Sequence, residues 1–179
     1  MKNIVLGITG SIAAYKAADI ANKLTKEGHS VRVVMTRSAT EFIGPLTLET
    51  LTKNKVYTDM FAEHDPSEVE HIALAQNADL ILIAPASANF IAKVAAGIGD
   101  DMLSTVMLAV KDAPILIAPA MNTYMYENPI TQRNIRTLSE FGMKFIEPRE
   151  ARLACGDVGK GALAEVDVIV AEAKKALGE

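Results

Sequence analysis

The chain has 179 residues, 18 basic against 22 acidic, and a formal charge of −4. This length suffices for one full hydrophobic core, and the dispersed basic residues exclude the phosphate-binding footprint of a nucleic-acid protein. No uncharged apolar run approaches the roughly 18 residues of a membrane-spanning helix, and the first residues lack a signal peptide's apolar region. We therefore expect a soluble, cytoplasmic protein with no membrane and no nucleic-acid partner.

Short β-branched runs alternate with longer amphipathic segments along the chain. We expect strands at residues 4–8, 31–35, 80–83 and 115–117, and helices at residues 13–27, 88–94, 102–110, 128–141 and 165–177. Nearly continuous apolar strands are typical of a parallel sheet with helices on both faces. The sequence predicts a single doubly wound α/β domain, Rossmann-like or flavodoxin-like, over residues 1–179, with ligands at the loops that follow the strands.

The first two of these loops favour a terminal phosphate. The first strand runs through GITGS, which ends in Gly10 and Ser11, directly into a helix whose free N–H groups attract anions. The second strand is followed by Thr36, Arg37 and Ser38. A dinucleotide site would have an acidic residue here to bind the ribose hydroxyls. Flavin mononucleotide (FMN) fits this pattern. NADP is a weaker alternative, whose extra phosphate could also use Arg37.

The third and fourth loops are rich in small and neutral polar residues. They read PASANF and PAMNTYMY, and Ser87, Asn89 and Asn122 supply donors and acceptors beside side chains small enough for a planar ring to approach. Taken singly, each loop also has a structural interpretation. PASA can simply end a strand and cap a helix, and Met121 and Met125 can be core residues at helical spacing.

The histidines give no clear site from the residues alone. His29 precedes a strand and is expected to be structural, while His64 lies in an acidic, solvated stretch. His71 begins the apolar-periodic segment HIALAQNA, which favours a capping or core role. A metal cluster of His64, Asp65, Glu70 and His71 lacks tight ligand spacing, so no metal site is expected.

The single cysteine, Cys155, cannot form an intrachain disulfide. It lies in ACGDVGKGAL, where three glycines within seven residues suit a mobile flap around residues 150–163 rather than a buried element. Asp100 and Asp101, which precede an expected helix, are sufficiently explained as an N-cap.

Four motifs in order, GSIAAYK, PASAN, PAMNxxM and ACG, resemble the homo-oligomeric flavin-containing cysteine decarboxylases from Asn3 to about Ile169. The resemblance implies FMN-dependent decarboxylation of 4'-phospho-N-pantothenoylcysteine to 4'-phosphopantetheine in coenzyme A biosynthesis, through a thioaldehyde and an enethiol. Two residues depart from the usual pattern, Phe90 in place of Thr and Tyr126 in place of Trp. Both could alter packing near the flavin without removing a reacting group.

The resemblance also implies residue roles. Asn122 would grip the substrate carboxylate with Met125 nearby, His71 would orient or deprotonate the reacting end, and Cys155 would protonate the enethiol carbon. The FMN phosphate would meet Gly10, Ser11, Thr36 and Ser38, and the ring would lie against Ser87, Ala88, Asn89, Phe90 and Ala120.

The expected partners are copies of the same chain and a second enzyme. Hydrophobic residues make up 50% of the chain before its 11 glycines are added, which is above the usual share, so we expect a homo-oligomer, a trimer or a dodecamer of trimers. A functional link to a separate phosphopantothenoylcysteine synthetase is also implied.

Three alternatives share the fold. A peptidyl-cysteine decarboxylase of the lantibiotic type would share every motif. A flavin prenyltransferase is disfavoured by PAMN and the flap cysteine, and a non-enzymatic flavoprotein regulator would be expected to lack His71 or Cys155.

Overall fold

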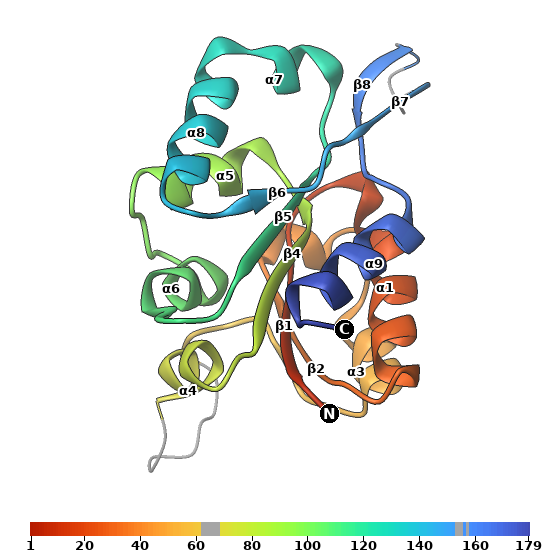
Figure 1. Ribbon diagram of the computed structural model, residues 1–179, viewed down its shortest axis with the longest axis vertical. Helices are drawn as coiled ribbons and strands as arrows, with labels where there is room; N and C mark the ends of the chain where they lie inside the picture. The colour runs from red at the N-terminus through yellow and green to blue at the C-terminus, as the bar shows by residue number, and fades with distance from the viewer. Residues whose placement is uncertain (62–68, 153–155, 157) are drawn as a thin grey trace.

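A six-stranded parallel sheet forms the centre of the protein (Figure 1). The computed structural model describes residues 1–61, 69–152, 156 and 158–179. The strands are β1 (Asn3–Ile8), β2 (Ser30–Met35), β3 (Val56–Tyr57), β4 (Leu80–Ala86), β5 (Ile115–Pro119) and β6 (Lys144–Phe145), and their order is β3-β2-β1-β4-β5-β6. The predicted doubly wound α/β fold is confirmed. This order is that of a Rossmann sheet, in which the chain reverses direction across the sheet between β1 and β4.

Helices bury both faces of this sheet (Figure 1). One face is covered by α1 (Lys16–Lys26), α3 (Pro45–Thr52) and α9 (Val166–Ala176), and the other by α4 (Glu70–Gln76), α5 (Ala88–Ala95), α6 (Met102–Ala109) and α8 (Pro129–Glu140). In β1, Ile4 and Leu6 point into the first layer and Val5 into the second. Because alternate side chains enter two different apolar layers, the strands are hydrophobic without a break.

The remaining elements are short. The helical segments η1 (Ile12–Tyr15), α2 (Arg37–Thr40) and α7 (Thr123–Glu127) follow β1, β2 and β5, and an antiparallel pair joins β7 (Arg149–Arg152) to β8 (Val158–Ala162). The helix expected at residues 13–27 is η1 followed by α1. The helices expected from the sequence do not include α3, although Pro45 at its first turn is a recognised helix-start signal.

Both chain ends lie at the amino ends of the strands (Figure 1). The amide of Ser30 donates to the carbonyl of Lys2 at 2.9 Å, and Nε2 of the buried His29 lies 3.5 Å from Oε2 of Glu179. The carboxyl ends of the strands are therefore clear of both termini. None of the described helices is long and apolar enough to cross a membrane.

Candidate functional site

A cavity of about 660 Å³ lies at the carboxyl ends of β1, β2, β4 and β5. The structure brings together there all the residues proposed for cofactor contact, and Asn122 and Met125 line the cavity as well. The cofactor candidates are Gly10, Ser11, Thr36, Ser38, Ser87, Ala88, Asn89, Phe90 and Ala120. Sequences far apart thus form one concave site at the position where open α/β sheets bind ligands.

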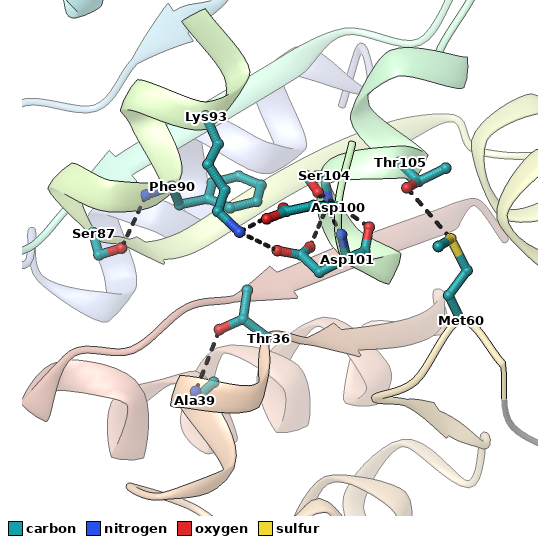
Figure 2. Close-up of polar contacts among 10 residues, drawn as sticks. All are labelled: Thr36, Ala39, Met60, Ser87, Phe90, Lys93, Asp100, Asp101, Ser104 and Thr105. Carbon is teal, nitrogen blue, oxygen red and sulfur yellow. Dashed lines mark hydrogen bonds and ion pairs between the residues drawn. The ribbon is translucent and has the colours of Figure 1, made fainter. Parts of the chain in front are cut away.

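A polar side chain caps the helical segment that follows each of the four strands. The four capping bonds run to Ser11 Oγ from the Ala13 amide at 3.3 Å, to Thr36 Oγ1 from Ala39 at 3.3 Å, to Ser87 Oγ from Phe90 at 3.2 Å, and to Asn122 Oδ1 from Tyr124 at 2.8 Å. Figure 2 shows those of Thr36 and Ser87. Ser87 is therefore a cap, as the structural interpretation of PASA holds, and it also lines the cavity.

Gly10 brings the first two loops into contact. A Cβ placed on Gly10 would lie 2.5 Å from Cβ of Ser38, closer than side-chain carbons approach one another. Among the described residues, the amides of Gly10 and Ser11 donate to no acceptor. These amides, the Ser38 hydroxyl and the helix start form a cradle that fits a phosphate group.

Thr9 joins the loops at the reversal point of the sheet. Its hydroxyl, which is buried, donates to the carbonyl of Pro85 and accepts from the amide of Ser87, both at 2.8 Å. The sequence reading missed Thr9. The available signal was a hydroxyl placed between strand and glycine in GITG, directly after a buried strand.

The charged residues that line the cavity are Arg37, Lys93 and Asp101. The Lys93 ammonium donates to Asp100 at 2.6 Å and to Asp101 at 3.0 Å (Figure 2). These hydrogen bonds, the one to Asp100 foremost, raise the pKa of Lys93, so its side chain stays charged. Asp101 caps α6 as expected, by accepting from the Ser104 amide at 2.8 Å. The sequence did not reveal that this cap also lines the cavity.

His71 does not line the cavity of its own chain. It is half-buried in the first turn of α4, which packs beside α6 (Figure 1). The neighbouring Glu70 accepts a 2.6 Å hydrogen bond from Lys55, which anchors the start of α4 to β3. Among the described residues no three metal-ligating side chains gather. His64 and Asp65 lie outside those residues.

The segment predicted as a flap coincides with β7 and β8, and Cys155 between them lies outside the described residues. The base of the pair joins the Asn122 loop, because the amide of Met121 donates to the carbonyl of Gly161 at 2.9 Å. A Cβ on Gly161 would lie only 2.4 Å from the Met121 carbonyl oxygen. Gly161 lines the cavity and was also missed from the sequence.

The two departures from the motif pattern have different surroundings. Phe90 is almost fully buried in the layer beneath α5 and α6 and also borders the cavity. Tyr126 packs under the Lys160 ammonium, which lies 5.8 Å from the ring centre. Burial raises the pKa of Tyr126. The cation–π contact ties α7 to β8.

Strands in this order, with a cavity at the point of reversal, define the nucleotide-binding class of doubly wound α/β proteins. The particular family follows from comparison with known proteins. The chain belongs to the flavoprotein family, whose sequence profile matches residues 1–178.

Two curated relatives cover nearly all of this chain. One, from Streptococcus mutans and named probable phosphopantothenoylcysteine decarboxylase, is 54% identical over 177 residues, which are 98% of this chain and 99% of the relative. The coenzyme A biosynthesis bifunctional protein CoaBC of Bacillus subtilis is 51% identical over 178 residues, but this chain, aligned over 99% of its length, spans only 44% of that protein.

Three solved structures have closely similar folds. A PPC decarboxylase mutant complexed with pantothenoylaminoethenethiol has a TM-score of 0.89 at 34% identity, covering 99% of both chains. The FMN-binding protein AtHal3 has a TM-score of 0.86 at 36% identity, covering 97% of this chain and 95% of that one. The FMN-dependent cysteine decarboxylase SpaF has a TM-score of 0.86 at 32% identity, covering 100% and 98%.

Proposed function

We propose that the chain is an FMN-dependent carboxy-lyase that converts 4'-phospho-N-pantothenoylcysteine to 4'-phosphopantetheine in coenzyme A biosynthesis. The observation that carries this proposal is the single cavity shared by GSIAAYK, PASAN and PAMNTYM, in a chain 54% identical over nearly its full length to a relative named for this activity. The prenyltransferase and regulator alternatives lack a comparable observation.

FMN fits the two ends of the cavity. At one end the amides of Gly10 and Ser11 and the hydroxyls of Thr36 and Ser38 would hold its phosphate, with Arg37 supplying a positive charge. At the other end the start of α5, residues 87–90, and Ala120 would lie against the ring. When bound, the flavin supplies a two-electron sink for the thiol-bearing carbon and later returns the pair.

The chain's own residues orient the substrate and move its protons. Asn122 holds the substrate carboxylate at the carboxyl end of β5. This contact aligns the C–C bond that breaks as carbon dioxide leaves. Cys155 donates a proton to the enethiol carbon after that loss. The solved relative complexed with pantothenoylaminoethenethiol supports an enethiol, because its ligand is named as one.

His71 lies on α4 and is not among the described residues that line the cavity of its own chain. A role in orienting or deprotonating the reacting end is met most directly if His71 faces the cavity of another copy. We therefore propose a homo-oligomer built from trimers in which His71 acts across a subunit boundary. Mixing His71→Asn chains with Asn122→Asp chains should restore turnover in mixed oligomers, whereas no restoration would contradict action between copies.

Two further proposals concern a substrate flap and a link to a second enzyme. We propose that residues 150–163 close over bound substrate as a flap within a single domain of residues 1–179. A link to a phosphopantothenoylcysteine synthetase is supported by the bifunctional B. subtilis relative, of which this chain spans less than half. The cytoplasmic location stays a prediction from the sequence.

A peptidyl-cysteine decarboxylase remains the second candidate, because SpaF, an FMN-dependent cysteine decarboxylase, has nearly the same fold.

Purified protein should be yellow and release FMN on denaturation, and release of FAD or NADP would reject the site as described. It should convert phosphopantothenoylcysteine to phosphopantetheine and leave a peptide with a C-terminal cysteine unchanged. The reverse preference would establish the second candidate.

Cys155 and His71 should fail at different stages. Cys155→Ser should oxidise and decarboxylate the substrate but stall with reduced flavin and an enethiol, because an alcohol is a much weaker acid than a thiol of pKa near 8.5. His71→Asn should leave the flavin oxidised. Nearly unchanged turnover in Cys155→Ser would reject the assigned role.

A further inference from the structure

The charges that line the cavity lie on two different sides of it. Arg37 begins α2, which follows β2, and lies beside the residues proposed to hold the phosphate. Lys93 and Asp101 come from α5 and from the start of α6, beyond the loop after β4. Lys93 lies one helical turn after Asn89 and so shares its face of α5. The charged pair therefore accompanies the segment that would hold the ring rather than the phosphate.

These two charges are held in place by several bonds. The Lys93 ammonium donates to two carboxylates, and Asp101 exchanges bonds with Ser104 on both its side chain and its backbone amide, as Figure 2 shows. The Lys93 and Asp101 side chains are 22% and 27% exposed, against 57% for Asp100. Asp100 is thus the most exposed of the three, while Lys93 and Asp101 are partly buried cavity residues whose opposite charges are held by hydrogen bonds. Lys93 also borders a neighbouring pocket together with Asp100.

We propose that Lys93 and Asp101 set the redox poise of the bound flavin, with the ammonium favouring the reduced ring and the carboxylate favouring the oxidised ring. This inference rests on the proposed function, because it requires FMN in the cavity. Both residues are positioning residues in this role, since they act through the electrostatic field at the ring.

In the proposed reaction the flavin must both accept an electron pair and return it. Two electrons and one proton pass to the flavin from a C–H bond of the substrate, the thiol proton is released, and after carbon dioxide leaves the same electron pair returns with protons to the product. The ring gains negative charge when it is reduced, so a nearby positive charge stabilises that state and a nearby negative charge opposes it. A pair of opposite charges keeps both transfers feasible.

Two substitutions should shift the flavin equilibrium in opposite directions. Lys93→Met removes the positive charge and leaves Asp101 unopposed. Asp101→Asn removes the negative charge but retains a side chain that caps a helix equally well, and Lys93 keeps its bond to Asp100. A neighbouring charge changes the ionisation equilibrium of a group by one to three powers of ten, so a change of about tenfold or more is expected for each variant.

The test is the two-electron midpoint potential of the purified FMN-loaded protein, measured with the Kd of oxidised FMN. Lys93→Met should lower the potential by about 30 mV or more, which is tenfold for a two-electron couple, and Asp101→Asn should raise it. Lys93→Arg should keep the parent potential. The matched control is Lys111→Met, because Lys111 is exposed, pairs with Asp112 and is not a cavity residue.

Several outcomes overturn the inference. Shifts in the same direction for both variants would indicate a structural disturbance, and unchanged potentials with FMN still bound would show that the charges do not act on the ring. A raised KM for substrate at an unchanged potential would assign Lys93 to the substrate instead. If Lys93→Met does not fold, the absence of a positive shift in Asp101→Asn is sufficient to reject the idea. A purified parent without FMN would reject the proposed function itself.

Discussion

Substituting Gly10 should weaken FMN binding through a steric effect that the structure quantifies. In Gly10→Ala the new Cβ would lie 2.5 Å from Cβ of Ser38, with the Ser38 carbonyl carbon at 3.3 Å, whereas carbon atoms normally meet at about 3.5–4.0 Å. The loops after β1 and β2 must therefore part by about 1 Å, at a cost of about 1–3 kcal/mol. We expect bound FMN to hold these loops together, so that the cost falls on binding and raises the Kd about 5- to 150-fold.

A double-mutant cycle isolates this contact. Ser38→Gly removes the Cβ that Gly10→Ala would strike, although it also removes a proposed phosphate ligand. Adding Gly10→Ala to Ser38→Gly should then raise the Kd less than about twofold further, a coupling typical of residues in contact. FMN affinity is measured by quenching of flavin fluorescence, and urea unfolding of each apoprotein checks its stability. Gly44→Ala is the control, because a Cβ there meets nothing within 4 Å.

The reasoning would be refuted by an equal penalty for Gly10→Ala in both backgrounds. Such additivity would show that the contact with Ser38 is not the cause. An undiminished FMN affinity in the single variant would likewise reject the assignment of this loop to the phosphate.

Three other substitutions test separate parts of the site and fold. Gly161→Ala should lower turnover about tenfold or more, since it separates β8 from Met121, while Gly28→Ala, where a Cβ meets nothing, should affect stability alone. Thr9→Val leaves the part-buried Ser87 amide without its partner, whereas the Pro85 carbonyl keeps its bond from the Thr9 amide at 3.2 Å. The loss of about 1–3 kcal/mol should lower the Tm by about 2–12 °C. The pKa of Asp79 is lowered, chiefly by the hydrogen bond from the amide of Asn3. The stabilisation by this carboxylate is therefore present above about pH 4 and is lost as the pH falls further. Asp79→Asn should accordingly reduce the change in the urea unfolding midpoint between pH 6 and pH 3.

Each of these has its own control. Equal turnover in Gly161→Ala and Gly28→Ala would contradict the close approach of β8. Thr50→Val removes an exposed hydroxyl that bonds within its own helix. If Thr50→Val lowered the Tm as much as Thr9→Val does, the hydroxyl of Thr9 would have no special role in joining the loops. Asp112→Asn, at an exposed position, should keep the parent's pH dependence, and so would Asp79→Asn if the bond to Asn3 contributed nothing.

The four loops of the site were predictable because small polar residues there serve two purposes. Ser11, Thr36, Ser87 and Asn122 occur where a strand ends and a helix begins, so the signal for a helix cap also marks the edge of a parallel sheet where ligands bind. Alternation of apolar runs likewise predicted the long helices and strands to within a few residues. These features depend on neighbours in the sequence.

The parts that were missed depend on contacts between distant elements. Lys93 becomes a cavity residue because α5 and α6 meet, and no local pattern states that. His71 has an obvious position in a helix, but the sequence does not tell which cavity that helix borders. For the residues of β7 and β8 the sequence predicts only a glycine-rich flap, since VGKGA has no apolar alternation to indicate a strand.

The location of the chain ends has a consequence for any domain joined to this one. Lys2, His29 and Glu179 gather at the amino ends of the strands, and the seven-residue β4 alone separates that end from the cavity by about 23 Å. A domain attached beyond Glu179 would therefore begin at the end of the sheet opposite the cavity. The attachment point itself does not cover the cavity.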